Sequence, residues 1–119
     1  MENLNYVFKD LRAIMLPYSA DLSTTLDTVD QLSLDTTHVM KNKKALWFGG
    51  VQVKKNYVSY HLMPVYLNPA LLDDISTELK KRRQGKSCFN FKAIDPALFR
   101  ELAELTKAGF EYYKREGYI

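Results

Sequence analysis

Apolar residues recur with a helical period at the start of the chain. They are spaced i, i+3, i+4 and i+7, at Leu4, Val7, Phe8, Leu11, Ile14 and Met15. This spacing places one apolar stripe on a helix over residues 4–16. Asn3 precedes the stripe and is expected to cap the helix, and Pro17 is expected to end it.

The middle of the chain alternates polar and apolar residues, a pattern typical of half-buried strands. Residues 21–37 predict two short strands, or one strand broken near Asp30. Leu46–Val53 and Tyr57–Tyr66 predict a hairpin after a polar loop over residues 38–45. A two-residue hairpin loop would pair Val53 with Val58, Val51 with Tyr60 and Gly49 with Leu62 on a core face that includes Trp47. It would pair Gln52 with Ser59 and Gly50 with His61 on the other face. A slip of one residue would invert both faces.

Turn and capping residues divide the C-terminal half. Asn68-Pro69 opens a short helix to Ile75, and Ser76 is expected to cap a second helix over Thr77–Gln84 that Gly85 ends. A short strand then follows at Ser87–Phe91.

A second amphipathic stripe predicts a long final helix. Asp95 supplies its cap and Pro96 its first turn, and the helix runs to about Arg115. Adjacent strands between terminal helices predict an α+β fold with an antiparallel sheet and helices on one face. A length of 119 residues fits one domain, spanning residues 1–119.

Composition narrows the function classes. The net charge of +3 is compatible with an anionic ligand but argues against a dedicated nucleic-acid binder. One cysteine excludes an internal disulfide and any zinc site built on several thiolates. We find neither a secretory signal pattern nor an apolar stretch long enough for a bilayer, and therefore expect a reducing, cytoplasmic location without membrane binding.

The segment Gly85-Lys86-Ser87 invites comparison with a phosphate-binding loop. That motif needs a glycine at position 80, which is Lys here, and a strand before it and a helix after it, the reverse of the predicted order. A plainer anion site is a carboxylate or phosphate held by Lys86, Lys92 and the backbone amides after Gly85. The alternative is a solvated turn with exposed lysines.

Cys88 lies in the predicted strand Ser87–Phe91. A nucleophilic thiol needs a lowered pKa and a base within reach, and His61 is the best candidate if the strands that carry the two residues are neighbours. The alternative is a buried cysteine that only packs. Without a full catalytic constellation, we expect a protein that is not an enzyme.

Two long segments, Phe48–Tyr66 (FGGVQVKKNYVSYHLMPVY) and Glu78–Lys92 (ELKKRRQGKSCFNFK), resemble the YdhG-like family, small bacterial domains of unknown function. The final segment ALFRELAELTKAGFEYYKREG also looks like the end of that family, so the resemblance covers essentially the whole chain. It implies a curved antiparallel sheet packed against N- and C-terminal helices. The positions that match the family are Tyr60, His61, Pro64, Gly85, Lys86, Cys88, Phe91 and Lys92.

Some family members have been likened to frataxin, which delivers iron for iron–sulfur cluster assembly. That role relies on an acidic ridge along the first helix and first strand. This chain offers there only Glu2, Asp10, Asp21 and Asp27, interleaved with Lys9 and Arg12. The resemblance therefore implies iron as a cofactor only weakly.

These observations lead to one functional hypothesis and two alternatives. We expect a non-enzymatic domain that binds a small anionic ligand or a protein partner's acidic segment. The alternatives are a frataxin-like iron chaperone and a thiol enzyme that uses Cys88 and His61. The stripe on residues 4–16 also leaves a homodimer open. The candidate ligand-binding residues are Tyr60, His61, Lys86, Ser87, Cys88, Asn90 and Lys92.

Overall fold

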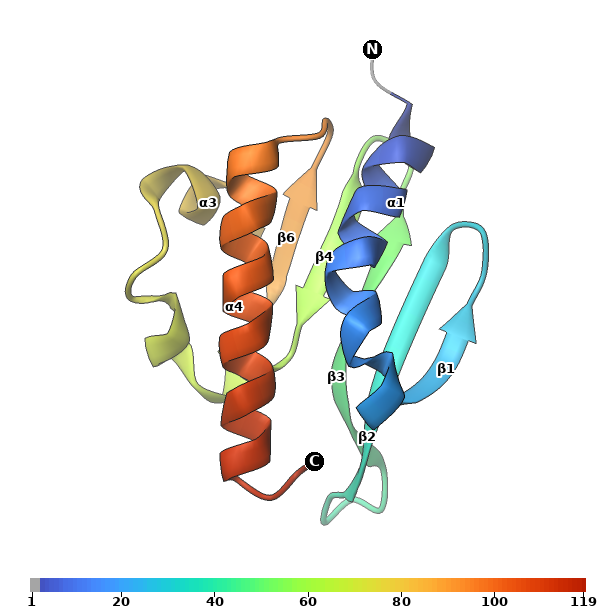
Figure 1. Cartoon of the computed structure of the whole chain (residues 1–119), viewed down its shortest axis with the longest axis vertical. Coiled ribbons are helices and arrows are strands. Elements are labelled where there is room, and N and C mark those ends of the chain that lie inside the picture. The colour runs from blue at the N-terminus through green and yellow to red at the C-terminus, as the bar shows by residue number, and fades with distance from the viewer. Residues whose placement is uncertain (1–2) are drawn as a thin grey trace.

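A computed structural model describes residues 3–119 and shows the expected α+β fold (Figure 1). Six strands form one antiparallel sheet in the order β1-β2-β3-β4-β6-β5. The strands are β1 (Ser23–Asp27), β2 (Gln31–Val39), β3 (Ala45–Val53), β4 (Val58–Leu62), β5 (Arg83–Gln84) and β6 (Cys88–Phe91). The α-helices are α1 (Leu4–Met15), α2 (Pro64–Leu67), α3 (Thr77–Arg82) and α4 (Pro96–Arg115), with 3-10 helices η1 (Leu16–Asp21) and η2 (Pro69–Leu72).

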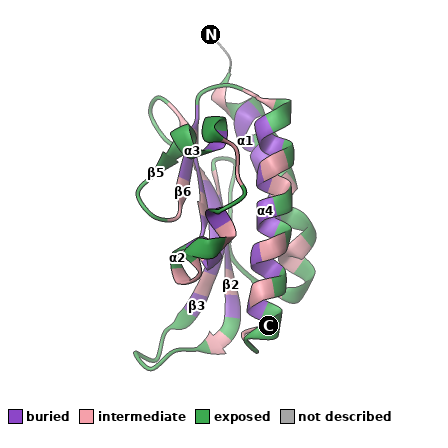
Figure 2. Ribbon diagram, turned by 90° about the vertical axis from the view of Figure 1, so that its left-hand side faces the viewer, coloured by how far each residue is buried: buried purple, intermediate pink, exposed green. Residues whose placement is uncertain are grey.

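The two terminal helices lie side by side against one face of the sheet (Figures 1 and 2). Both begin at the predicted caps. The Asn3 side chain accepts a hydrogen bond from Asn5 N at 2.8 Å, and Asp95 Oδ1 accepts one from Leu98 N at 3.1 Å. Helix α4 ends at Arg115, as expected, and Gly117 follows it with a φ of 81°.

The register of β3 and β4 confirms the predicted hairpin. Val53 pairs with Val58, and His61 pairs with Gly50. The predicted break near Asp30 separates β1 from β2 as two strands.

Three predicted boundaries were wrong. The short helix expected from Pro69 to Ile75 is the 3-10 helix η2, which ends at Leu72. The strand expected over Tyr57–Tyr66 ends at Leu62, and Pro64 instead begins the short helix α2, a position where proline's missing N–H costs nothing. Helix α3 ends at Arg82 rather than Gln84, because Arg83 and Gln84 pair with β6 as strand β5. Gly85, with φ of 77°, therefore serves the turn between β5 and β6 instead of the end of the helix.

A β-bulge in β3 overturns the face predicted for Trp47. Leu34 pairs with Gly49, whereas the next residue of β2, Asp35, pairs with Trp47, so Phe48 is an extra residue on β3. The extra residue shifts the alternation by one. Phe48 therefore points into the core, and Trp47 points away from the helices, where its Nε1 donates to Ser33 Oγ at 2.9 Å.

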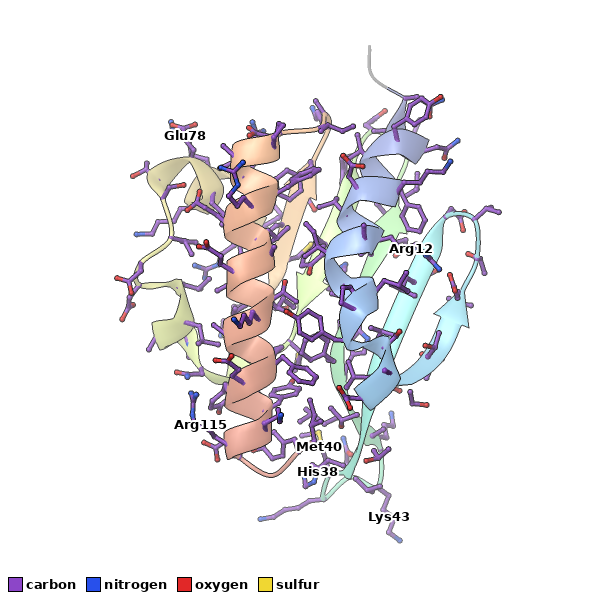
Figure 3. All side chains as sticks on the ribbon, viewed as in Figure 1. Arg12, His38, Met40, Lys43, Glu78 and Arg115 are labelled. Atoms are coloured by element: carbon purple, nitrogen blue, oxygen red, sulfur yellow. The ribbon has the colours of Figure 1, made fainter. Side chains whose placement is uncertain are left out.

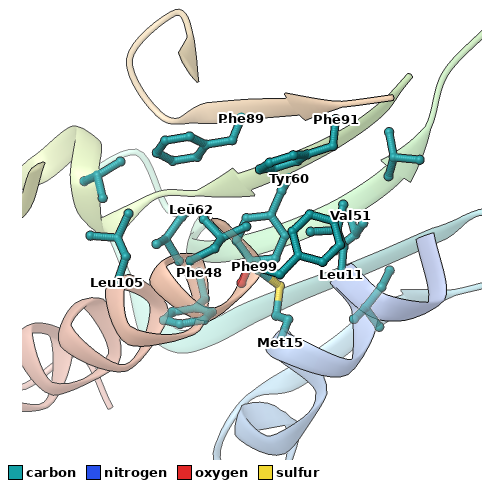
Figure 4. Packing of buried hydrophobic residues seen from close by; sticks show 14 of the residues in the cluster. Leu11, Met15, Phe48, Val51, Tyr60, Leu62, Phe89, Phe91, Phe99 and Leu105 are labelled. Atoms are coloured by element: carbon teal, nitrogen blue, oxygen red, sulfur yellow. The ribbon is translucent and has the colours of Figure 1, made fainter. Parts of the chain in front are cut away.

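Side chains from both terminal helices meet the strands in one core (Figure 4). Leu11 and Met15 come from α1, and Phe99 and Leu105 come from α4. Where β3 passes Met15, a Cβ atom on Gly49 would lie 2.9 Å from Met15 Cε and would also collide with the His61 carbonyl oxygen. Glycine at position 49 therefore permits close packing between α1 and the sheet.

Tyr60 and Thr106 link the sheet to α4 through a buried hydrogen bond. Both residues are 0% exposed, and their hydroxyl oxygens lie 2.6 Å apart. The Thr106 hydroxyl donates its one hydrogen to the Leu102 carbonyl oxygen at 2.8 Å. Tyr60 must therefore be the donor to Thr106.

The other face of the sheet carries no terminal helix, and we call it the open face (Figure 2). Side chains of alternate strand residues point to it. On the central strands these are Ser33, Trp47, Gln52, Ser59, His61, Cys88 and Asn90.

Candidate functional site

Pairing of β4 with β6 places Cys88 directly across from His61 on the open face. The condition set by the sequence, that these two strands are neighbours, is thus met. Cys88 Sγ lies 3.8 Å from His61 Nε2, and the same nitrogen lies 3.2 Å from Ser59 Oγ. The thiol is 3.3 Å from Asn90 Oδ1, and the Trp47 ring centroid lies 5.4 Å from that of His61.

The electrostatic surroundings keep the thiol and the imidazole neutral. Burial raises the pKa of the Cys88 thiol, and the nearby Lys54 charge lowers it by less. Burial, together with the Lys54 charge, lowers the pKa of His61. A catalytic thiolate–imidazolium pair needs the opposite shifts. The pair therefore lacks the charge state of an activated nucleophile.

The structure divides the other predicted site residues among three places. Tyr60 is fully buried on the helix-covered face, with its phenol bonded to Thr106, so it does not gather with His61. Lys86 and Ser87 precede β6, and Lys92 follows it. The two lysines line separate cavities at opposite ends of β6 and so do not form one anion site.

A cavity of about 350 Å³ lies beside Lys86, where α2 and η2 meet β5. Its lining is apolar apart from the phenol of Tyr66 and two cations. The lining residues are Val65, Tyr66, Pro69, Leu72, Arg83 and Lys86. Lys86 Nζ lies 5.5 Å from the centroid of the Tyr66 ring, close enough for a cation–π contact.

Arg83 is held in place by its own turn, because its Nε donates to the Gly85 carbonyl oxygen at 3.0 Å. The bond occupies only Nε, and no hydrogen bond from the terminal guanidinium nitrogens is found among residues 3–119. Within residues 3–119, neither Arg83 nor Lys86 forms an ion pair. The sequence analysis identified neither Arg83 nor Tyr66 as a site residue. The signal available for Arg83 was its position two residues before the turn glycine Gly85.

A larger groove of about 780 Å³ runs between α1 and the turn from β1 to β2. Arg12 projects from α1 toward β1 (Figure 3) and forms an ion pair with Asp27 at 2.8 Å. Lys9 and Asp30 add one further charge of each sign. Because its arginine already has an acidic partner, this groove is a weaker anion site than the cavity beside Lys86.

Residues 3–119 contain no group of three or more His, Cys, Asp or Glu side chains arranged to hold a metal ion. Of the acidic residues considered for iron, Asp27 is paired with Arg12, Asp10 and Asp21 are exposed, and Glu2 lies outside the described residues. Across the part of the chain that is described, none of the helices has the length and apolar character needed to cross a membrane.

Comparison of the chain with protein-family models, with curated proteins and with solved structures finds no match.

Proposed function

We propose that this protein is a non-enzymatic binding domain that holds a small organic anion in the cavity lined by Tyr66, Arg83 and Lys86. The ligand carries a carboxylate or phosphate group, which the two cations bind. Its apolar part lies against the floor that Val65 and Leu72 form. An acidic side chain of a protein partner would present the same chemistry to the same cations.

One observation carries this proposal: two cations without ion-pair partners in the described chain border an apolar cavity whose described lining holds no carboxylate. The free edge of a guanidinium matches the two oxygens of a carboxylate or phosphate and bonds both at once. Lysine adds a second positive charge with adjustable direction. The fixed position of Arg83 lowers the entropy lost when a ligand binds.

The state of the Cys88–His61 pair favours binding over catalysis. A neutral thiol and a neutral imidazole give a weak nucleophile, and no carboxylate bonds to the imidazole in residues 3–119. The resemblance to the YdhG-like family, the iron role it implies and a cytoplasmic location stay predictions.

The first experiment is a thermal-shift screen of the whole chain with carboxylates, phosphate monoesters, a glutamate-rich peptide and ferrous iron. A ligand at about 100 times its Kd should add about 2.7 kcal/mol to the free energy of unfolding. Hits are then titrated by calorimetry. Small anions and the acidic peptide distinguish a metabolite from a protein partner, and a response to iron alone would favour the iron chaperone.

The chain offers a matched control for the binding residues. We expect Arg83→Ala/Lys86→Ala to weaken binding of an anionic hit by about tenfold or more, since it removes two charged contacts. Arg82→Ala/Lys92→Ala removes the same two residue types from positions that line a different cavity. Equal losses in both double variants would show only a general charge effect and would contradict the proposal.

A further inference from the structure

Four donor atoms form a compact block on the open face, apart from the proposed anion cavity. Register places His61 opposite Cys88 and Ser59 opposite Asn90, so the four side chains project from neighbouring positions on β4 and β6. Ser59 Oγ lies 3.2 Å from His61 Nε2, which lies 3.8 Å from Cys88 Sγ, and Sγ lies 3.3 Å from Asn90 Oδ1.

We propose that this block binds a single thiophilic metal ion, such as Zn²⁺ or Cu⁺, with Cys88 Sγ and His61 Nε2 as its two protein ligands. Thiolate and imidazole are the donors that such ions select. Zinc bonds of about 2.3 Å to sulfur and about 2.1 Å to nitrogen give an angle of about 120° at the metal when the donors are 3.8 Å apart. The unliganded separation is thus already close to that of a liganded pair.

The surroundings of the two ligands suit metal entry. Cys88 and His61 are both partly exposed, so an ion reaches them without opening the core. His61 Nε2 is the imidazole nitrogen that faces the thiol, and a metal ion bound there would replace its contact with Ser59 Oγ at 3.2 Å. The thiol loses its proton to solvent when the metal–sulfur bond forms, so each ion bound releases one proton.

Neutral oxygens and a cation set the strength of the site. Ser59 Oγ and Asn90 Oδ1 lie beside the two ligands, and water completes the coordination shell. Lys54 opposes a bound cation, because its charge acts on both His61 and Cys88. Two strong ligands and one nearby cation define a weak, exchangeable site, and Lys54→Ala should tighten it severalfold.

Cobalt provides a direct test, because a cobalt–thiolate bond absorbs in the near ultraviolet. The whole chain is titrated with Co²⁺ without oxygen, and Zn²⁺ is then added to displace it. Trp47 is the single tryptophan of the chain and lies beside His61, so its fluorescence reports the same event. We expect one ion per chain, an absorption band with matching quenching, and loss of both signals when Zn²⁺ is added.

Variants assign the ligands. Cys88→Ser should abolish the absorption band, and His61→Gln should weaken binding by roughly tenfold or more. His38→Gln is the matched control, because His38 lies on β2 and packs against Tyr118, with ring centroids 4.7 Å apart, rather than against Cys88. If Cys88→Ser does not fold, Cys88 is instead alkylated in the folded wild-type protein, and the absorption band should again be lost. No band at millimolar Co²⁺, a band that survives loss of the thiol, or one ion per two chains would overturn the proposal.

Discussion

Replacing Thr106 by valine should cost more stability than replacing Tyr60 by phenylalanine, although each change deletes the same hydrogen bond. The difference follows from which hydroxyl donates. Tyr60 gives its only hydrogen to Thr106, whereas Thr106 gives its own hydrogen to the Leu102 carbonyl oxygen. Tyr60→Phe therefore leaves the Thr106 hydroxyl with a partner, and Thr106→Val leaves the Tyr60 hydroxyl with none.

The two losses of stability differ because a buried hydroxyl without a hydrogen-bond partner lowers the free energy of unfolding further. Loss of a neutral hydrogen bond between two groups that find other partners costs about 1 kcal/mol. Thr106→Val adds the desolvation penalty of the phenol that stays buried, about 1–3 kcal/mol. Valine has nearly the shape of threonine, so no cavity term enters that variant. The expected total is about 1 kcal/mol for Tyr60→Phe and about 2–4 kcal/mol for Thr106→Val.

Urea unfolding of the two variants, with the double variant, measures these differences. The double variant should be more stable than the sum of the single costs predicts, because no buried phenol is then left without a partner. In thermal unfolding, 1 kcal/mol corresponds to about 4 °C for a domain of this size. Equal costs, or a larger cost for Tyr60→Phe, would refute the assignment of Tyr60 as donor.

Three further predictions concern packing and titration. Gly49→Ala should lower the free energy of unfolding by about 1–3 kcal/mol, because its Cβ would meet the His61 backbone; a melting temperature equal to wild type would contradict this. The fluorescence of Trp47 should change with pH at a midpoint below the ordinary 6.5 of histidine, since burial and then the Lys54 charge lower the pKa of His61, and His61→Gln should remove the change. Burial raises the pKa of Tyr113, so the unfolded chain releases the phenolic proton before the folded chain does. The contribution of Tyr113 to the free energy of unfolding should therefore be complete below about pH 10 and fall above it. If the urea midpoint falls equally with pH in Tyr113→Phe, Tyr113 is not the cause of the fall.

The sequence predicted correctly those helices and strands that are set by residues close together in the chain. Asn3 and Asp95 fixed the starts of the terminal helices, and a two-residue loop set the register of β3 with β4. Trp47 was placed on the wrong face because the bulge at Phe48 depends on how β3 pairs with β2. Alternation within one strand carries no information about such a pairing.

The candidate sites depended more strongly on contacts between distant segments. The sequence raised Cys88 and His61 as a pair only on the condition that their strands were neighbours, and the β4–β6 ladder supplied that condition. The anion cavity was missed in part, because Tyr66 and Arg83 come together only when β5 and β6 fold back beside α2 and η2. Lys86 was named from its turn, but its proposed partner Lys92 lies at the other end of β6.

The strand order has a consequence for how the protein folds. Strands β1 to β4 are joined by hairpins, so each can form from neighbouring chain with a small loss of entropy. Strand β6 adds to β4 only after an excursion that includes α2 and α3, and Cys88 meets His61 across 27 residues. Until β6 docks, a partly folded chain has its histidine on the sheet without the thiol beside it. Cys88 stays partly exposed in the folded chain, so the time at which its rate of modification by a thiol reagent falls from the unfolded to the folded value would mark the docking of the last strand.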